Sequence, residues 1–204
     1  MNAFFDNIQA FLLNVFIIYF CFTLYFKFVE RKMSRLKRES TVTLVSIVSI
    51  IFCMSFPVMN LSGYILDFRQ VPLVIGVLYG GRRVAVVLIL ALLSYRFYLD
   101  IPGFHLALFS YSLLLISLIL IIPLFRKTVN MRRKVQMAAL ASLFGAASRM
   151  GLILEFFSGK LTMESLIVFI LILFSQSIGV VFFVITNERT RQGVLLSREV
   201  MKLE

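Results

Sequence analysis

Long apolar stretches, separated by short polar segments that are mostly basic, make up most of the chain. A transmembrane helix needs about 20 mainly apolar residues to cross about 30 Å of hydrocarbon. Stretches of suitable length predict membrane-spanning helices over residues 8–26, 42–59, 84–99, 104–125, 135–157 and 165–186. The pattern therefore predicts an all-α fold, a polytopic membrane helix bundle.

One further apolar segment, residues 62–81, is too short to cross a membrane unaided, because only about 11 of its residues are continuously apolar. Its polar start contains Asp67 and Arg69 and must be sheltered by protein, since lipid offers no hydrogen bonds. Counting this segment gives seven spans. A re-entrant hairpin formed with the following segment would remove both spans together and leave the direction of the other helices unchanged. We expect six to seven spans.

Composition and charge agree with a membrane protein and set its orientation. The chain has 204 residues, of which 60% are hydrophobic and 15% charged, and its net charge is +11. Most Lys and Arg residues fall in residues 27–38, 82–83, 126–134 and 189–202, between apolar stretches or after the last one. Because cytoplasmic loops carry the excess of positive charge, we predict an outside N-terminus and a cytoplasmic C-terminus. This placement argues for the lipid bilayer, and against nucleic acid, as the partner of these cations.

The same pattern divides the chain into three parts. Residues 1–41 form an N-terminal span and a basic loop, residues 42–186 form the membrane bundle, and residues 187–204 form a polar cytoplasmic extension. The extension carries Leu196, Val200 and Leu203 at a spacing typical of coiled coils. We therefore expect it to continue the last helix out of the membrane and to favour a homodimer.

The residues that usually perform chemistry are scarce. Cys21 and Cys53 lie inside predicted spans, where a thiol behaves as a small buried apolar group, so we expect no disulfide. A single His and the lack of a Cys-x-x-Cys motif exclude the usual zinc spacings. The sequence shows no pairing of nucleophile and base and no phosphate-binding loop. We expect no metal, no cofactor and no catalytic residue in this chain.

Three arginines fall within the outer part of predicted spans: Arg69, Arg96 and Arg149. A charged side chain in the membrane is costly and marks a functional site by default. Guanidinium groups hold carboxylates in a two-pronged arrangement, so converging arginines suit a small anionic ligand. Ser110 and Tyr95 are further candidates at this depth.

The alternative is that resident carboxylates neutralise these arginines. Asp67, Asp100 and Glu155 are near enough in sequence to serve. For Arg149 the two interpretations stay open, because Glu155 shares its predicted helix. For Arg69 and Arg96 we favour ligand contact.

The segment DFRQVPLVIGVLYGGRRVAVVLILALLSYRFYLDIPG resembles the core of the five-transmembrane receptor domain of the LytS/YhcK type. That family's pattern runs from an acidic-x-Arg, through Val-Pro and an apolar stretch ending in aromatic-Gly-Gly, to a helix ending in Tyr-Arg-aromatic. The matching positions are Asp67, Arg69, Val71, Pro72, Tyr79, Gly80, Gly81, Tyr95, Arg96 and Phe97. The similarity extends over about residues 42–186.

The resemblance implies a membrane input domain of a sensor histidine kinase or a diguanylate cyclase, in a family in which some members respond to pyruvate. It implies that Arg69 and Arg96 hold the ligand carboxylate and that a polar residue on the following helix assists, a role that Ser110 can fill. We also expect Asp67 to belong to this site. Pyruvate-sensing relatives carry a Cys where this chain has Ala107. The N-terminal span and the polar extension resemble kinases of the sporulation kinase B type, which implies a bacterial plasma membrane and a kinase region beyond Glu204.

Two other functions fit parts of the pattern. The receptor fold is thought to resemble the substrate-binding membrane subunit of energy-coupling-factor transporters, so a transporter subunit is the main alternative. A membrane anchor that senses through a partner protein is the other. Measuring the binding of small carboxylates to the purified protein and to variants at Arg69 and Arg96 distinguishes these functions from a carboxylate sensor.

Overall fold

The computed structural model describes residues 2–26, 35–61, 64–99, 104–157 and 163–200. Within these ranges the chain forms helices joined by short connections, with one small hairpin. The elements are α1 (Asn2–Leu24), α2 (Arg35–Ser55), β1 (Met59–Leu61), β2 (Tyr64–Leu66), α3 (Gln70–Gly80), α4 (Arg82–Tyr98), α5 (Phe104–Lys127), α6 (Met131–Phe157) and α7 (Met163–Val200).

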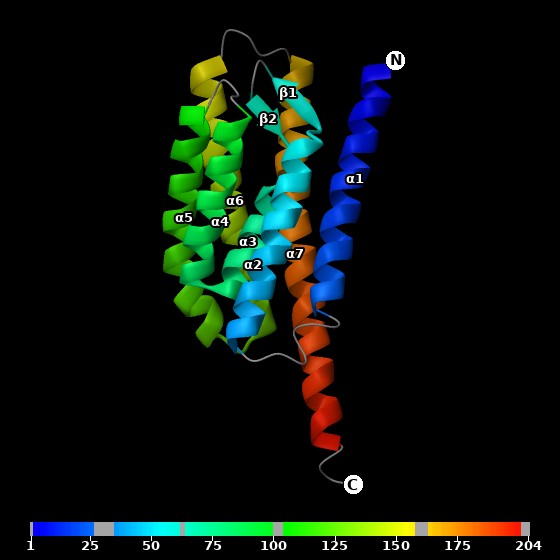
Figure 1. Ribbon diagram of the computed structural model, residues 1–204, viewed down its shortest axis with the longest axis vertical. Coiled ribbons are helices and arrows are strands. Elements are labelled where there is room, and N and C mark those ends of the chain that lie inside the picture. Colours follow the sequence, from blue (N-terminus) through cyan, green and yellow to red (C-terminus); the bar gives the residue numbers. More distant parts are fainter. Residues whose placement is uncertain (1, 27–34, 62–63, 100–103, 158–162, 201–204) are drawn as a thin grey trace.

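The helices lie side by side and alternate in direction along the long axis of the molecule (Figure 1). One end of the bundle holds the β1–β2 hairpin and is called the hairpin end. The opposite end, called the basic end, holds the first turns of α2, α4 and α6 and the last turn of α5, which carry most of the clustered Lys and Arg residues. Helix α7 continues past the other helices at the basic end (Figure 1).

The structure confirms a helical membrane bundle. Among the described residues, four helical segments are long and apolar enough to cross a bilayer: Lys37–Ser55, Phe104–Lys127, Met131–Glu155 and Leu166–Thr190. Cys21 and Cys53 are free thiols.

The segment before α3 differs from the sequence expectation, because part of residues 62–81 belongs to a hairpin and not to a span. Helix α2 ends two residues before Pro57, as expected where proline disfavours helix in the preceding residue. The chain then pairs antiparallel, Met59 with Leu66 and Leu61 with Tyr64. Strand pairing gives the backbone groups partners that the broken helix no longer supplies. The all-α prediction therefore misses this hairpin.

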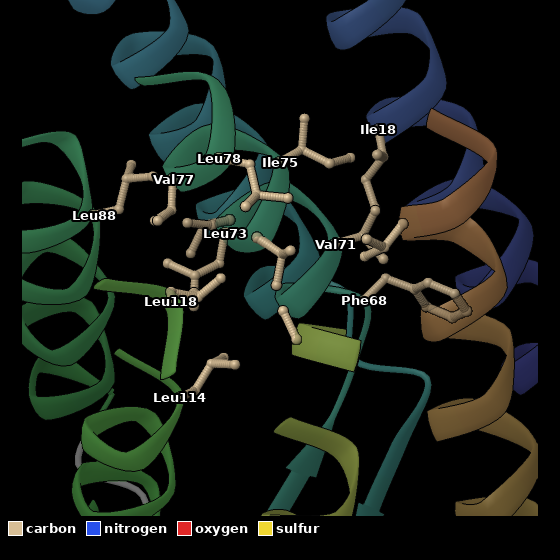
Figure 2. Packing of buried hydrophobic residues seen from close by; sticks show 14 of the residues in the cluster. Ile18, Phe68, Val71, Leu73, Ile75, Val77, Leu78, Leu88, Leu114 and Leu118 are labelled. Atoms are coloured by element: carbon tan, nitrogen blue, oxygen red, sulfur yellow. The ribbon is translucent and has the colours of Figure 1, made fainter. Parts of the chain in front are cut away.

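Helix α3 lies at the centre of the fold. It has only 11 residues, and all of them are buried. Figure 2 shows Leu73 and Val77 of α3 in the same cluster as Leu88 of α4 and Leu118 of α5. A helix that is apolar on every side is a buried one, so α3 is enclosed by protein and the longer helices face the lipid.

Gly76 provides a test of this close packing. A Cβ added there would lie 2.7 Å from Leu88 Cδ1 and closer still to Ser46 Oγ. We expect Gly76→Ala to lower the free energy of unfolding by about 1–3 kcal/mol, the usual cost of overpacking. Thermal unfolding of the purified protein in detergent measures the effect.

Gly151→Ala is the matched control, because Gly151 is an exposed helical glycine with nothing within 4 Å of an added Cβ. Alanine there is expected to leave stability unchanged or raise it by about 0.5–1 kcal/mol. Equal unfolding temperatures for the two variants would contradict the packing around α3.

Candidate functional site

A buried ion pair lies at the start of α3, between the hairpin and the helix. Arg69 Nε donates to Asp67 Oδ1 at 2.6 Å, and Arg69 Nη2 lies 2.5 Å from Asp67 Oδ2. The backbone N–H of Arg69 donates to the same carboxylate at 2.9 Å. The two side chains are only 3% and 0% exposed. This two-pronged contact joins the carboxylate to the first turn of α3, where the helix dipole also favours negative charge.

Gln176 of α7 connects this ion pair to α6. Its Nε2 donates to the backbone carbonyl of Asp67, and its Oε1 accepts from Arg149 Nη2 at 2.7 Å. Gln176 is fully buried. One amide side chain therefore joins the start of α3 to α6 and α7.

Arg149 is buried among neutral partners. Besides Gln176 Oε1, its acceptor is the carbonyl of Gly145, 3.1 Å from Arg149 Nε. The side chain of Glu155, its expected counter-ion, is exposed to the exterior. Within the described part of the chain Arg149 forms no ion pair. Gln176 therefore links Arg149 to the Asp67–Arg69 ion pair, so three of the predicted residues belong to one network.

A second polar network, not foreseen from the sequence, lies beside the first. Gln70 Nε2 donates to the carbonyl of Ser142 at 2.8 Å, and Ser142 Oγ donates to Ser177 Oγ at 3.1 Å. Gln70 Oε1 has no hydrogen-bond partner. Ser142, Gln176 and Ser177 interrupt long apolar helices, and that is the sequence signal that marks them.

The other predicted residues lie on α4 and α5. Arg96 is 1% exposed and is the largest fully buried side chain among the described residues. Ser110 is also buried, and its hydroxyl donates to the carbonyl of Ala107 at 3.3 Å. Tyr95 instead shares a 2.9 Å hydrogen bond with Ser55 of α2, which is exposed. The geometry thus places the Tyr95 hydroxyl at the α2–α4 contact. Asp100 falls outside the described residues.

At the basic end, Tyr79 forms a junction with α5, α6 and α7. Its hydroxyl donates to Glu188 Oε1 at 3.2 Å, and its ring meets Phe125 edge-on at 5.5 Å. Lys134 Nζ forms an ion pair with Glu188 at 2.8 Å and lies 5.6 Å from the centre of the Phe125 ring. We call these four residues the Tyr79 junction. Helix α3 therefore has polar contacts with α7 close to both of its ends.

Comparison with known families identifies this arrangement. The family model described as 5TMR of 5TMR-LYT, a five-transmembrane receptor domain, matches residues 22–189. The chain belongs to this family. No curated protein and no solved structure matches the chain. The match confirms the resemblance drawn from the motif residues.

The matched region of this five-transmembrane receptor domain runs from the last turn of α1 to residue 189 of α7 and leaves residues 1–21 of the chain outside. Helix α1 packs against the domain through its aromatic side chains. Phe11 lies 5.0 Å from Phe68, and Tyr19 lies 6.3 Å from Phe183 of α7, measured between ring centres. The additional helix therefore contacts α7 and the segment just before α3.

The Asp67–Arg69 pair predicts a non-additive effect on the stability of the receptor domain. We expect Arg69→Ala to lower the free energy of unfolding by about 3–5 kcal/mol, because it leaves a buried carboxylate unpaired. The double variant Asp67→Asn with Arg69→Gln removes both charges and keeps hydrogen-bonding groups, so its loss is expected to be much smaller. Thermal unfolding in detergent compares them. If both variants lost the same free energy of unfolding, Asp67 and Arg69 would not form a buried pair in which each charge neutralises the other.

Proposed function

We propose that this receptor domain is the sensor input of a two-component or phosphorelay histidine kinase and that it binds a small extracellular carboxylate resembling pyruvate. The observation that supports this most is the environment of Arg149. Arg149 is 5% exposed, and the two hydrogen-bond acceptors of its guanidinium are uncharged oxygens. A buried charge without a counter-charge costs several kcal/mol. An anionic ligand would supply the missing charge.

The proposed site is lined by Arg69, Arg96 and Arg149, with Ser110 as a further polar contact. The fork of Arg69 is already held by Asp67. A ligand carboxylate would compete with Asp67 for this guanidinium, because both present the same pair of oxygens. The domain then has two arrangements, with either Asp67 or the ligand on Arg69, and the ligand favours the second by its direct contacts.

Helix α7 is the proposed output, because it contacts α3 at two levels. Gln176 binds the backbone of Asp67 near the ion pair, and Glu188 binds Tyr79 at the other end of α3. A change in the position of Asp67 therefore acts on α7 directly through Gln176. Helix α7 continues to Val200 beyond the bundle, where it is suited to move a cytoplasmic partner (Figure 1).

The finer topology is part of the same proposal. The basic end is assigned to the cytoplasm and the hairpin end to the outside of a bacterial plasma membrane, in line with the positive-inside rule. With α3 and α4 counted as crossings, the chain has seven spans in a fold like that of the transporter substrate-binding subunits. Residues 187–204 lead towards the kinase region and favour a homodimer.

Pyruvate binding to the purified protein tests the ligand hypothesis. We expect Arg149→Gln to weaken binding about 10- to 150-fold, the equivalent of one charge-assisted hydrogen bond at about 1.5–3 kcal/mol. Isothermal titration calorimetry in detergent gives the dissociation constants. Arg132→Gln is the matched control, because Arg132 is exposed at the basic end. Unchanged affinity in Arg149→Gln, or no binding by the wild-type protein, would remove the pyruvate-binding hypothesis.

Hydrogen exchange tests the output. We expect saturating pyruvate to change amide exchange in residues 183–190 of α7 in the wild-type protein. Tyr79→Phe removes the hydroxyl that binds Glu188 and keeps the ring against Phe125. This variant is expected to bind pyruvate normally and to lose most of the change in α7. An undiminished change would show that the signal does not pass through the Tyr79 junction.

A further inference from the structure

A groove at the basic end carries three arginines. It has a volume of about 560 Å³ and lies where α2, α4 and α5 meet. Its lining residues are Glu39, Gly80, Arg82, Arg83, Ile122, Pro123 and Arg126. Three guanidinium groups and one carboxylate give the lining an excess of positive charge, which suits an anionic group such as a phosphate.

An apolar furrow adjoins this groove. It has a volume of about 410 Å³ and shares Glu39 and Arg83 with the groove. From there it runs along α2 and α4, lined by Ser40, Thr43, Leu44, Ile47, Val84 and Val87. These positions advance by about one turn at a time along both helices. Leu44 is 62% exposed, so the furrow opens on the surface that faces lipid.

The turn between α3 and α4 fixes one arginine of the groove. Gly81 has a φ of 90°, and a Cβ there would lie 2.5 Å from Arg126 Nη2. The same Nη2 donates to the carbonyl of Tyr79 at 3.1 Å. Glycine is required here for two reasons. It adopts the positive φ without strain, and its lack of a Cβ lets the guanidinium approach closely. The result is a cation that is exposed to solvent and yet held in place by a hydrogen bond to the backbone.

We propose that the groove and the furrow together bind one anionic phospholipid from the leaflet at the basic end. The phosphate lies among Arg82, Arg83 and Arg126, and an acyl chain follows the furrow past Leu44 and Val87. A polar groove continuous with an apolar furrow matches an amphiphile. A free anion would bind in the groove alone and leave the furrow empty. Glu39 suits the hydroxyl groups of a glycerol headgroup, which donate hydrogen bonds to a carboxylate.

Native mass spectrometry of the detergent-purified protein, with phosphatidylglycerol or phosphatidylcholine added, tests the proposal. We expect phosphatidylglycerol to be retained preferentially. Arg82→Gln with Arg83→Gln should reduce its retention about thirtyfold, since each basic residue near an anionic lipid contributes about 1 kcal/mol. Both arginines are exposed, so folding should survive, and the unfolding temperature checks this.

Arg132→Gln with Arg133→Gln is the matched control, because it removes the same charge from exposed positions at the same end, outside the groove. It is expected to retain the lipid nearly as well as the wild-type protein. Val87→Trp fills the furrow and should reduce lipid retention without affecting glycerol phosphate. The proposal would be overturned if the Arg82/Arg83 and Arg132/Arg133 variants lost phosphatidylglycerol retention equally. Binding of glycerol phosphate as tightly as the lipid would also overturn it. Pyruvate binding at the hairpin end is unaffected by any of these outcomes.

Discussion

The enclosure of α3 is the constraint on which the rest of the fold depends. A helix of 11 residues rises about 16 Å, about half of what a bilayer requires, so its ends lie at membrane depth. Lipid cannot satisfy polar groups there. The bundle supplies partners instead, with Asp67 and Gln176 near the first turn and Glu188 and Lys134 near the last. Helices α2, α4, α5, α6 and α7 all pack against α3.

The two ends of the bundle use cations in different ways. At the hairpin end Arg69, Arg96 and Arg149 are removed from solvent. A guanidinium tolerates such burial better than an ammonium because it is weakly hydrated and presents donors in a fixed plane. At the basic end Arg82 and Arg83 are exposed and line a groove that adjoins an apolar furrow. The first arrangement is the basis of the proposed binding of a small, enclosed ligand, and the second is the basis of the proposed binding of a lipid headgroup at the membrane surface.

Sequence reasoning located the helices and the family motif because these depend on local pattern. Hydrophobic length predicted the long helices, and the motif around Asp67 and Arg69 predicted the receptor family that the family model confirms. The hairpin was missed because strands of three residues are too short to show a period of two. The Gln70–Ser142–Ser177 network was missed because uncharged polar residues in apolar helices find partners only through packing. The sequence alone could not choose the hydrogen-bond partner of Arg149, because that partner, Gln176 and not Glu155, lies on another helix.

The double attachment of α7 to α3 restricts how the receptor domain can change shape. A buried hydrogen-bonding group that loses its partner costs about 1–3 kcal/mol, so intermediate positions of α7 that leave Gln176 or Glu188 unpaired are disfavoured. Because a close-packed protein interior is barely compressible, a displacement of one group is passed on to the groups packed against it. A movement of Asp67 must therefore either break the contact with Gln176 or carry α7 with it. If α7 moves, Glu188 must leave Tyr79 or draw the end of α3 along. This pairing favours discrete arrangements of the last helix over intermediate ones, which is what its proposed role as the output requires.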